Sequence, residues 1–184
     1  MGSHEKKTTS YKEQDPEKVK KYLEEIENIP EDEIVYVDET GIDQCLYREY
    51  GYALRGEKVR AEIAGKKFQR TNIVAGQMAK KIISPMQYSG TTDSELFEFW
   101  FEHRLLSCIS EGQVIVMDNA SFHRKDELSQ IAGKYKCRII FLPPYSPEYN
   151  PIEKSWANLK KYLKYHISSF DSLDDAIYSF FQVC

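Results

Sequence analysis

Three acidic side chains lie at the boundaries of elements that the sequence predicts. Asp38 directly follows the apolar run of residues 34–37. Asp118 follows a second apolar run, residues 114–117. If both runs are neighbouring parallel strands, their ends lie ~5 Å apart and the two aspartates can face one spot. Glu153 comes from a third element, because it falls near the start of a predicted helix.

Carboxylates gathered in this way are typical of a metal-dependent phosphoryl-transfer site. Two carboxylates that lie close together repel each other when both are ionised, so their pairing needs a cation. Hard oxygen ligands with open positions suit Mg2+ or Mn2+. Two such ions ~4 Å apart would activate a nucleophile and stabilise a leaving oxygen. The pattern therefore favours a two-metal site.

Each of these acids also has a structural explanation. Asn150, Pro151 and Glu153 resemble a capping box, in which Glu153 would serve only its own helix. Asp118 could instead begin a turn, and Asp38 could mark the exit of a strand. None of the three motifs decides between chemistry and structure when it is taken alone.

The neighbours of these acids are candidates for supporting roles. Glu39 competes with Asp38, but side chains alternate along a strand, so Glu39 is expected on the opposite face and Asp38 is preferred. Asn119 and His123 are possible auxiliary residues. His123 is expected near the start of a helix over residues 123–132, where it could contact a phosphate or a metal-bound water. A lone histidine is more often structural, so both interpretations stay open.

Hydrophobic periodicity and turn signals give the elements that must position these residues. Short connections favour antiparallel pairing of the early strands, and intervening helices favour parallel pairing of the later ones. The expected fold is α/β, with a mixed five-stranded sheet of three antiparallel and then two parallel strands, flanked by helices. Strands are predicted over residues 33–39, 69–78, 80–88, 113–117 and 138–142. Helices are predicted from Asp15-Pro16, from the cap at residues 92–95, and over residues 123–132, 150–165 and 172–181, with Trp156 packing the helix of Glu153 against the sheet.

The bulk properties fit one globular domain of 184 residues. Residues 1–14 are expected to be a tag and a flexible N-terminus, residues 15–32 a short helix and linker, and residues 33–184 the main domain. No apolar run approaches the ~20 residues that a membrane span requires. The four cysteines are scattered, which favours reduced thiols in a cytosolic protein over a zinc site.

The charge distribution bears on nucleic-acid binding. The net charge of −4 argues weakly against it, but residues 1–33 hold ten acids and six lysines, so the remainder is balanced. Between residues 55 and 70, six basic residues accompany two acids, which favours contact with a phosphate backbone, although a solvated hairpin face is an equal alternative. These basic residues are Arg55, Lys58, Arg60, Lys66, Lys67 and Arg70.

The motifs together resemble the catalytic domain of mariner-type transposases, and their bacterial insertion-sequence relatives most closely. The resemblance is carried by Val-Tyr-Val-Asp38-Glu-Thr-Gly, by Val-Met-Asp118-Asn-Ala-Ser-Phe-His123, and by Leu-Pro-Pro-Tyr-Ser-Pro-Glu-Tyr-Asn150-Pro-Ile-Glu153-Lys-Ser-Trp. The last motif is the most specific, because so long a combination rarely arises otherwise. The match covers roughly residues 33–165.

This resemblance implies a ribonuclease H-like fold for the main domain and cut-and-paste DNA transposition with Mg2+ or Mn2+. It assigns Asp38, Asp118 and Glu153 as the metal-binding catalytic triad. In such enzymes a metal-activated water cleaves the transposon end, and the freed 3′-hydroxyl then attacks target DNA, typically at a TA dinucleotide. The implied partners are DNA and a second copy of the chain, and the implied location is the bacterial cytoplasm, in association with the nucleoid.

One departure from the family concerns DNA recognition. Family members usually carry helix-turn-helix domains before the catalytic domain, whereas only about thirty residues precede Asp38, and that segment carries a net negative charge. The sequence-reading part is therefore expected either to be truncated or to be a separate chain. A ribonuclease H-like nuclease without strand transfer, and an inactive or domesticated DNA-binding relative, remain alternatives.

Overall fold

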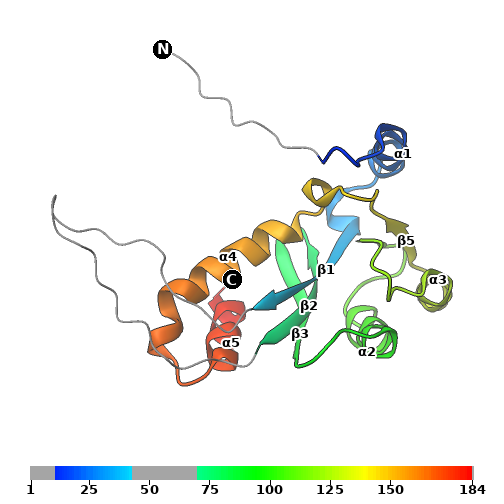
Figure 1. The fold of residues 1–184 in the computed structure, drawn as a ribbon. Helices are drawn as coiled ribbons and strands as arrows, with labels where there is room; N and C mark the ends of the chain where they lie inside the picture. Colours follow the sequence, from blue (N-terminus) through cyan, green and yellow to red (C-terminus); the bar gives the residue numbers. More distant parts are fainter. Residues whose placement is uncertain (1–10, 43–69, 184) are drawn as a thin grey trace, which may run out of the picture.

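The sheet consists of five strands in the order β3-β2-β1-β4-β5 (Figure 1). The computed structural model describes residues 11–42 and 70–183. β1 pairs antiparallel with β2, and β2 pairs antiparallel with β3, whereas β1 with β4 and β4 with β5 are parallel. The predicted mixed sheet is therefore confirmed. The strands are β1 (Ile34–Ile42), β2 (Thr71–Met78), β3 (Lys81–Tyr88), β4 (Val114–Met117) and β5 (Arg138–Phe141).

The predicted tight turn between the second and third strands is also confirmed. Ala79 and Lys80 connect β2 to β3 with φ angles of 46° and 69°. Two successive residues with positive φ are the conformation of a type I′ hairpin turn, whose twist matches that of the flanking strands.

In the described part of the chain, five α-helices accompany the sheet. Asp15 caps the first by accepting hydrogen bonds from the amides of Glu17 and Lys18, and Asp93 caps the second through the amide of Leu96, as the sequence predicts. None of the helices within residues 11–42 and 70–183 is both long enough and apolar enough to cross a bilayer. They are α1 (Pro16–Ile26), α2 (Ser94–Trp100), α3 (Lys125–Lys134), α4 (Ile152–His166) and α5 (Leu173–Val183), with α2 continuing into a π-helical turn, Phe101–Leu105.

The third helix begins later than predicted. It was expected over residues 123–132 but starts at Lys125, so His123 lies in the loop before it. The His123 amide donates to the carbonyl of Ala120, a turn contact rather than a helical one. This loop follows β4 directly and carries two of the candidate site residues, Asp118 and Asn119.

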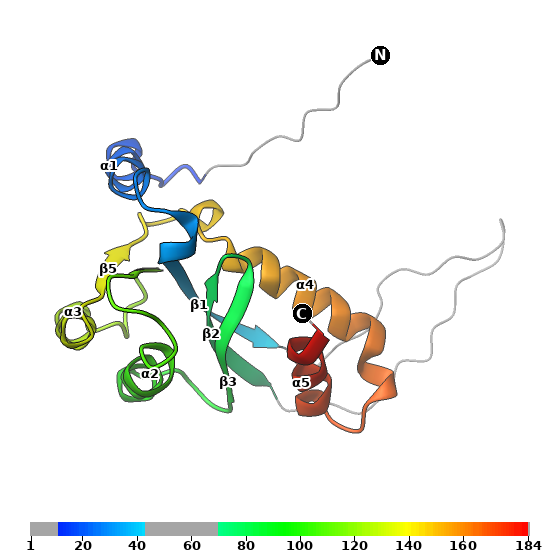
Figure 2. The same ribbon diagram turned by 180° about the vertical axis from the view of Figure 1, so that it is seen from behind.

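Helices cover both faces of the sheet (Figures 1 and 2). On one face, Val35, Val37, Ile115 and Met117 are buried in a core with residues of α2 and α3. On the opposite side, α4 and α5 pack against Ile42, Ile73 and Ala75 of β1 and β2, and Tyr22 of α1 packs beside Ile34 and Val116. Neighbouring residues of β1 therefore face different helices, as the alternation of a strand requires.

Candidate active site

Asp38 lies within β1 rather than at its end. Parallel pairing of β1 with β4 stops at Tyr36, but antiparallel pairing with β2 continues to Ile42. The prediction that the strand finishes at residue 39 was therefore wrong, because β2 supplies partners beyond that point. Asp38 still meets the site, since it lies just past the last residue of β1 that β4 covers.

Asp118 directly follows the last residue of β4, as predicted. Its Oδ1 accepts a hydrogen bond of 3.0 Å from the Ala120 amide, so the turn proposed as an alternative is indeed present. Asn119 donates from its side chain to the carbonyl of Leu142, which ties the loop after β4 to the loop after β5. The turn fixes the position of Asp118 without removing it from the site, because its side chain is 49% exposed.

Glu153 lies in the first turn of α4, but the capping box is wrong. Pro151 occupies the cap position and no side chain caps the helix. The Asn150 side chain instead donates to the Val37 carbonyl of β1 at 3.4 Å. In a capping box the side-chain oxygen of Asn150 would accept from the Glu153 amide, but that oxygen has no hydrogen-bond partner among the described residues, and Glu153 is left exposed at the helix start.

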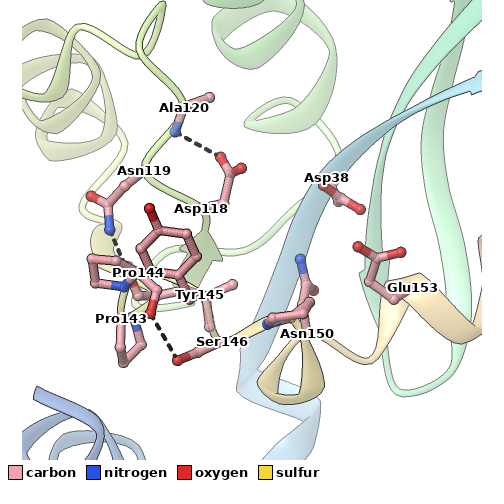
Figure 3. A pocket seen from close by; sticks show the side chains of 12 residues that line it. Asp38, Asp118, Asn119, Ala120, Pro143, Pro144, Tyr145, Ser146, Asn150 and Glu153 are labelled. Atoms are coloured by element: carbon pink, nitrogen blue, oxygen red, sulfur yellow. Dashed lines mark hydrogen bonds between the residues drawn. The ribbon is translucent and has the colours of Figure 1, made fainter. Parts of the chain in front are cut away.

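The three acids line one hollow of about 420 Å³ (Figure 3). The carboxylates of Asp38 and Glu153 point toward each other, whereas that of Asp118 is turned toward Ala120. Among the described residues, no basic side chain lines the hollow, and the donor set fits a hard divalent cation. The lining residues are Asp38, Asp118, Asn119, Ala120, Leu142, Pro143, Pro144, Tyr145, Ser146, Pro147, Asn150 and Glu153.

Asp38 is the acid of this group whose pKa is raised most clearly. Its burial, followed by repulsion from Glu153, Glu39 and Asp118, raises its pKa from 3.8 to about 8, although a hydrogen bond to the Glu39 backbone opposes the rise. An ionised Asp38 therefore needs a compensating positive charge near neutral pH. This electrostatic imbalance agrees with the donor set in favouring a cation.

His123 contacts Asp118 but is not among the residues that line the hollow. Its Nδ1 lies 3.3 Å from Asp118 Oδ1, and its Nε2 lies 3.4 Å from Glu39 Oε1. The ring is buried between Phe97 and Phe122, with centroids 4.3 and 4.4 Å away. Within the described part of the chain, Glu39, Asp118 and His123 form the one trio of possible ligand residues whose atoms all lie within 4.8 Å.

Two contacts of the site were missed from the sequence. Trp156 packs α4 against the sheet as predicted, but its Nε1 also donates to Asp38 Oδ2 at 2.9 Å. Asn150, which directly precedes the cap residue of α4, joins this end of the helix to β1, as described above. The only signal for the first contact was the position of Trp156 one helical turn after Glu153, which puts both side chains on the same side of a helix.

The basic stretch of residues 55–70 falls almost entirely outside the described residues. Arg55, Lys58, Arg60, Lys66 and Lys67 all lie there. Arg70 is described, directly before β2. Its guanidinium lies against Gly41, since a Cβ added at Gly41 would fall 2.7 Å from the Arg70 Nη2 atom.

The comparisons with known proteins bear on the fold and the family. A family model described as a DDE superfamily endonuclease matches residues 33–175. Comparison with curated protein sequences gives no match.

Several solved structures resemble the chain. The Mos1 strand transfer complex matches with a TM-score of 0.63 and 15% identity, over 99% of this chain and 63% of that one. The mariner Mos1 paired-end complex with Mg matches with a TM-score of 0.59 and 14% identity, over 99% and 65%. The HTLV-2 integrase catalytic core domain, in a dimeric form with magnesium, matches with a TM-score of 0.52 and 16% identity, over 83% and 85%. These likenesses confirm the predicted ribonuclease H-like fold, and the chain spans less than two thirds of the Mos1 chains.

Proposed function

We propose, because the chain belongs to the DDE superfamily of endonucleases, that it is the catalytic domain of a DNA transposase. The observation that carries the proposal is the convergence of Asp38, Asp118 and Glu153 on one hollow, whose described lining holds no basic side chain. These acids come from β1, from the loop after β4 and from α4, which are far apart in the sequence. Together they are the Asp, Asp and Glu after which the superfamily is named.

In this proposal the three carboxylates hold Mg2+ or Mn2+, as two ions. Bound there, the ions supply Lewis-acid stabilisation of the attacking and leaving oxygens. The carboxylates set the position of that charge, and residues 142–147 line the hollow beside them. The raised pKa of Asp38 supports this assignment, because a cation is what allows that acid to ionise near neutral pH.

The proposed reaction has two in-line displacements at phosphorus. In the first, a water oxygen bonds to the phosphorus at the transposon end and loses a proton, and the 3′ oxygen leaves and takes up a proton to become the 3′-hydroxyl. In the second, the freed 3′-hydroxyl bonds to a target phosphorus, and the 3′ oxygen of the target strand leaves while the hydroxyl proton is released. One carboxylate site serves both steps because each is an in-line displacement, in which the attacking and leaving oxygens lie on opposite sides of the phosphorus.

The proposed partners are transposon and target DNA and a second copy of the chain. We assign backbone contact with DNA to Arg55, Lys58, Arg60, Lys66, Lys67 and Arg70, on the charge of that stretch alone. A homodimer is proposed because two transposon ends must be brought together. The bacterial cytoplasm, in association with the nucleoid, is the proposed location.

The test uses a DNA duplex with a pre-cleaved transposon end, a supercoiled target and Mn2+. Wild type should yield joined products, and Asp118→Asn should yield none while its far-ultraviolet circular dichroism is unchanged. Asp126→Asn is the matched control, because Asp126 is an exposed acid on the neighbouring helix α3. Full activity of Asp118→Asn would refute the assignment, and hydrolysis without joining by wild type would favour a nuclease instead.

A further inference from the structure

The indole of Trp156 is directed at one of the three acids. Its Nε1 donates a hydrogen bond of 2.9 Å to Asp38 Oδ2. Trp156 is only 2% exposed and belongs to the core cluster that contains Ile73 and Ala75 of β2. The ring is therefore held by packing before it makes the hydrogen bond, so the donor cannot follow Asp38 if that side chain rotates.

The helix that carries Trp156 is attached to the sheet at three polar points. Besides the Trp156 bond, Asn150 donates to the Val37 carbonyl at 3.4 Å, and Ser155 donates to Gln77 Oε1 at 2.6 Å. These contacts reach β1 and β2 on the face that α4 covers. The first two turns of α4 are thereby fixed relative to the strand of Asp38.

Helix α4 thus carries one of the three acids, Glu153, and holds a second, Asp38, through Trp156. Glu153 and Trp156 lie three residues apart on α4, so they occupy neighbouring positions on its surface. Glu153 projects into the hollow itself (Figure 3), while Trp156 binds Asp38 on the side of the core. A hydrogen bond to Oδ2 leaves Oδ1 of Asp38 as the oxygen available to the hollow.

We infer that Trp156 is a positioning residue for Asp38, whose indole N–H fixes the carboxylate so that its other oxygen faces the metal site. The inference rests on the proposed function, because it assumes that Asp38 is a metal ligand. Groups that orient ligating carboxylates typically change metal affinity or activity by about 10–100-fold when they are removed. Trp156 therefore contributes to the chemistry without touching DNA or metal.

The test compares two tryptophan replacements. Trp156→Phe keeps an aromatic ring but removes the donor. Trp100→Phe is the matched control, because Trp100 is fully buried and its Nε1 donates at 2.8 Å to the Ser84 carbonyl, away from the hollow. Calorimetric titration with Mn2+ should give a Kd about 10–100-fold weaker for Trp156→Phe, and an unchanged Kd for Trp100→Phe. An unchanged Kd for Trp156→Phe, or equal weakening in both variants, would overturn the inference.

A second measurement keeps the inference testable if Trp156→Phe does not fold. The chain has two tryptophans, so a 15N-labelled sample gives two indole N–H resonances, and the one retained in Trp100→Phe belongs to Trp156. Mg2+ should shift the Trp156 resonance and leave that of Trp100 in place. Binding of Mg2+ without a shift at Trp156 would overturn the inference. Failure of wild type to bind Mg2+ or Mn2+ at all would instead refute the proposed function.

Discussion

Replacing Asp38 by asparagine should stabilise the metal-free protein, and increasingly so as the pH rises. The pKa of Asp38 is about 8 in the folded protein and 3.8 as an ordinary carboxyl. Between these two values the folded state holds a proton that the unfolded state has lost. Wild type therefore loses stability with rising pH in this window, because unfolding releases the carboxyl to ionise in water. Asparagine at this position does not titrate, so the variant does not undergo this loss of stability as the pH rises.

The expected difference in the free energy of unfolding between the two proteins follows from the difference between the two pKa values. Each pKa unit corresponds to about 1.4 kcal/mol, so the stability gap between Asp38→Asn and wild type should widen by up to about 1.4 kcal/mol per pH unit from pH 4 to pH 8. The full difference between 3.8 and about 8 gives a gap on the order of 6 kcal/mol as an upper bound. Above pH 8 the gap should stay constant, since Asp38 is then ionised in both states.

Urea unfolding in the presence of EDTA, at pH 5, 6, 7, 8 and 9, measures this gap. Comparing the two proteins at each pH cancels the titration of all groups that they share. In 10 mM Mg2+ the wild type should regain stability while Asp38→Asn should not, because the metal replaces the proton on Asp38. A gap that does not change with pH would show that Asp38 titrates as an ordinary surface carboxyl, and the electrostatic argument for a cation would fail.

Four further predictions concern single elements of the site and the fold. Glu153→Gln should abolish strand joining while unfolding at the temperature of wild type, as seen by calorimetry. His123→Phe should keep the aromatic packing but lose the contact with Asp118, so the joining rate should fall about 10–100-fold with the helix content unchanged. Charge reversal at Lys66 and Lys67 should weaken DNA binding and flatten the dependence of log Kd on log salt, and an unchanged slope would count against that stretch as the DNA contact. Asp15→Ala should cost about 1 kcal/mol in urea unfolding, because it removes the acceptor for two amides of α1, and should not affect Mn2+ affinity.

Local patterns in the sequence were enough to predict the sheet. The two apolar runs before Asp38 and Asp118 became β1 and β4, and positive φ angles at Ala79 and Lys80 formed the expected hairpin turn. These features depend on neighbouring residues, whose burial pattern is visible in the chain. The parallel pairing of β1 with β4 then brought the two aspartates to one site, although Asp38 lies within β1 and not at its end.

The contacts that the sequence did not predict all join distant segments. The bond from Trp156 to Asp38 spans 118 residues, and that from Asn150 to Val37 spans 113. A capping box was a reasonable prediction at Asn150 because its residues are adjacent, but the carbonyl of β1 competes for the same side chain. His123 was placed in a helix for a similar reason, since its role is set by Asp118 and Glu39 rather than by its neighbours in the chain.

Contacts on the two opposite faces of β1 position the two aspartates of the site. Asp38 points from β1 toward α4, where Trp156 binds it. Glu39, the next residue, points to the other face, where it contacts His123, and His123 in turn contacts Asp118. A shift of one residue in the register of β1 would exchange the two faces and break both sets of contacts at once. The extended pairing of β1 with β2, which carried Asp38 away from a strand end, is thus the feature that keeps this register and with it the spacing of the acids.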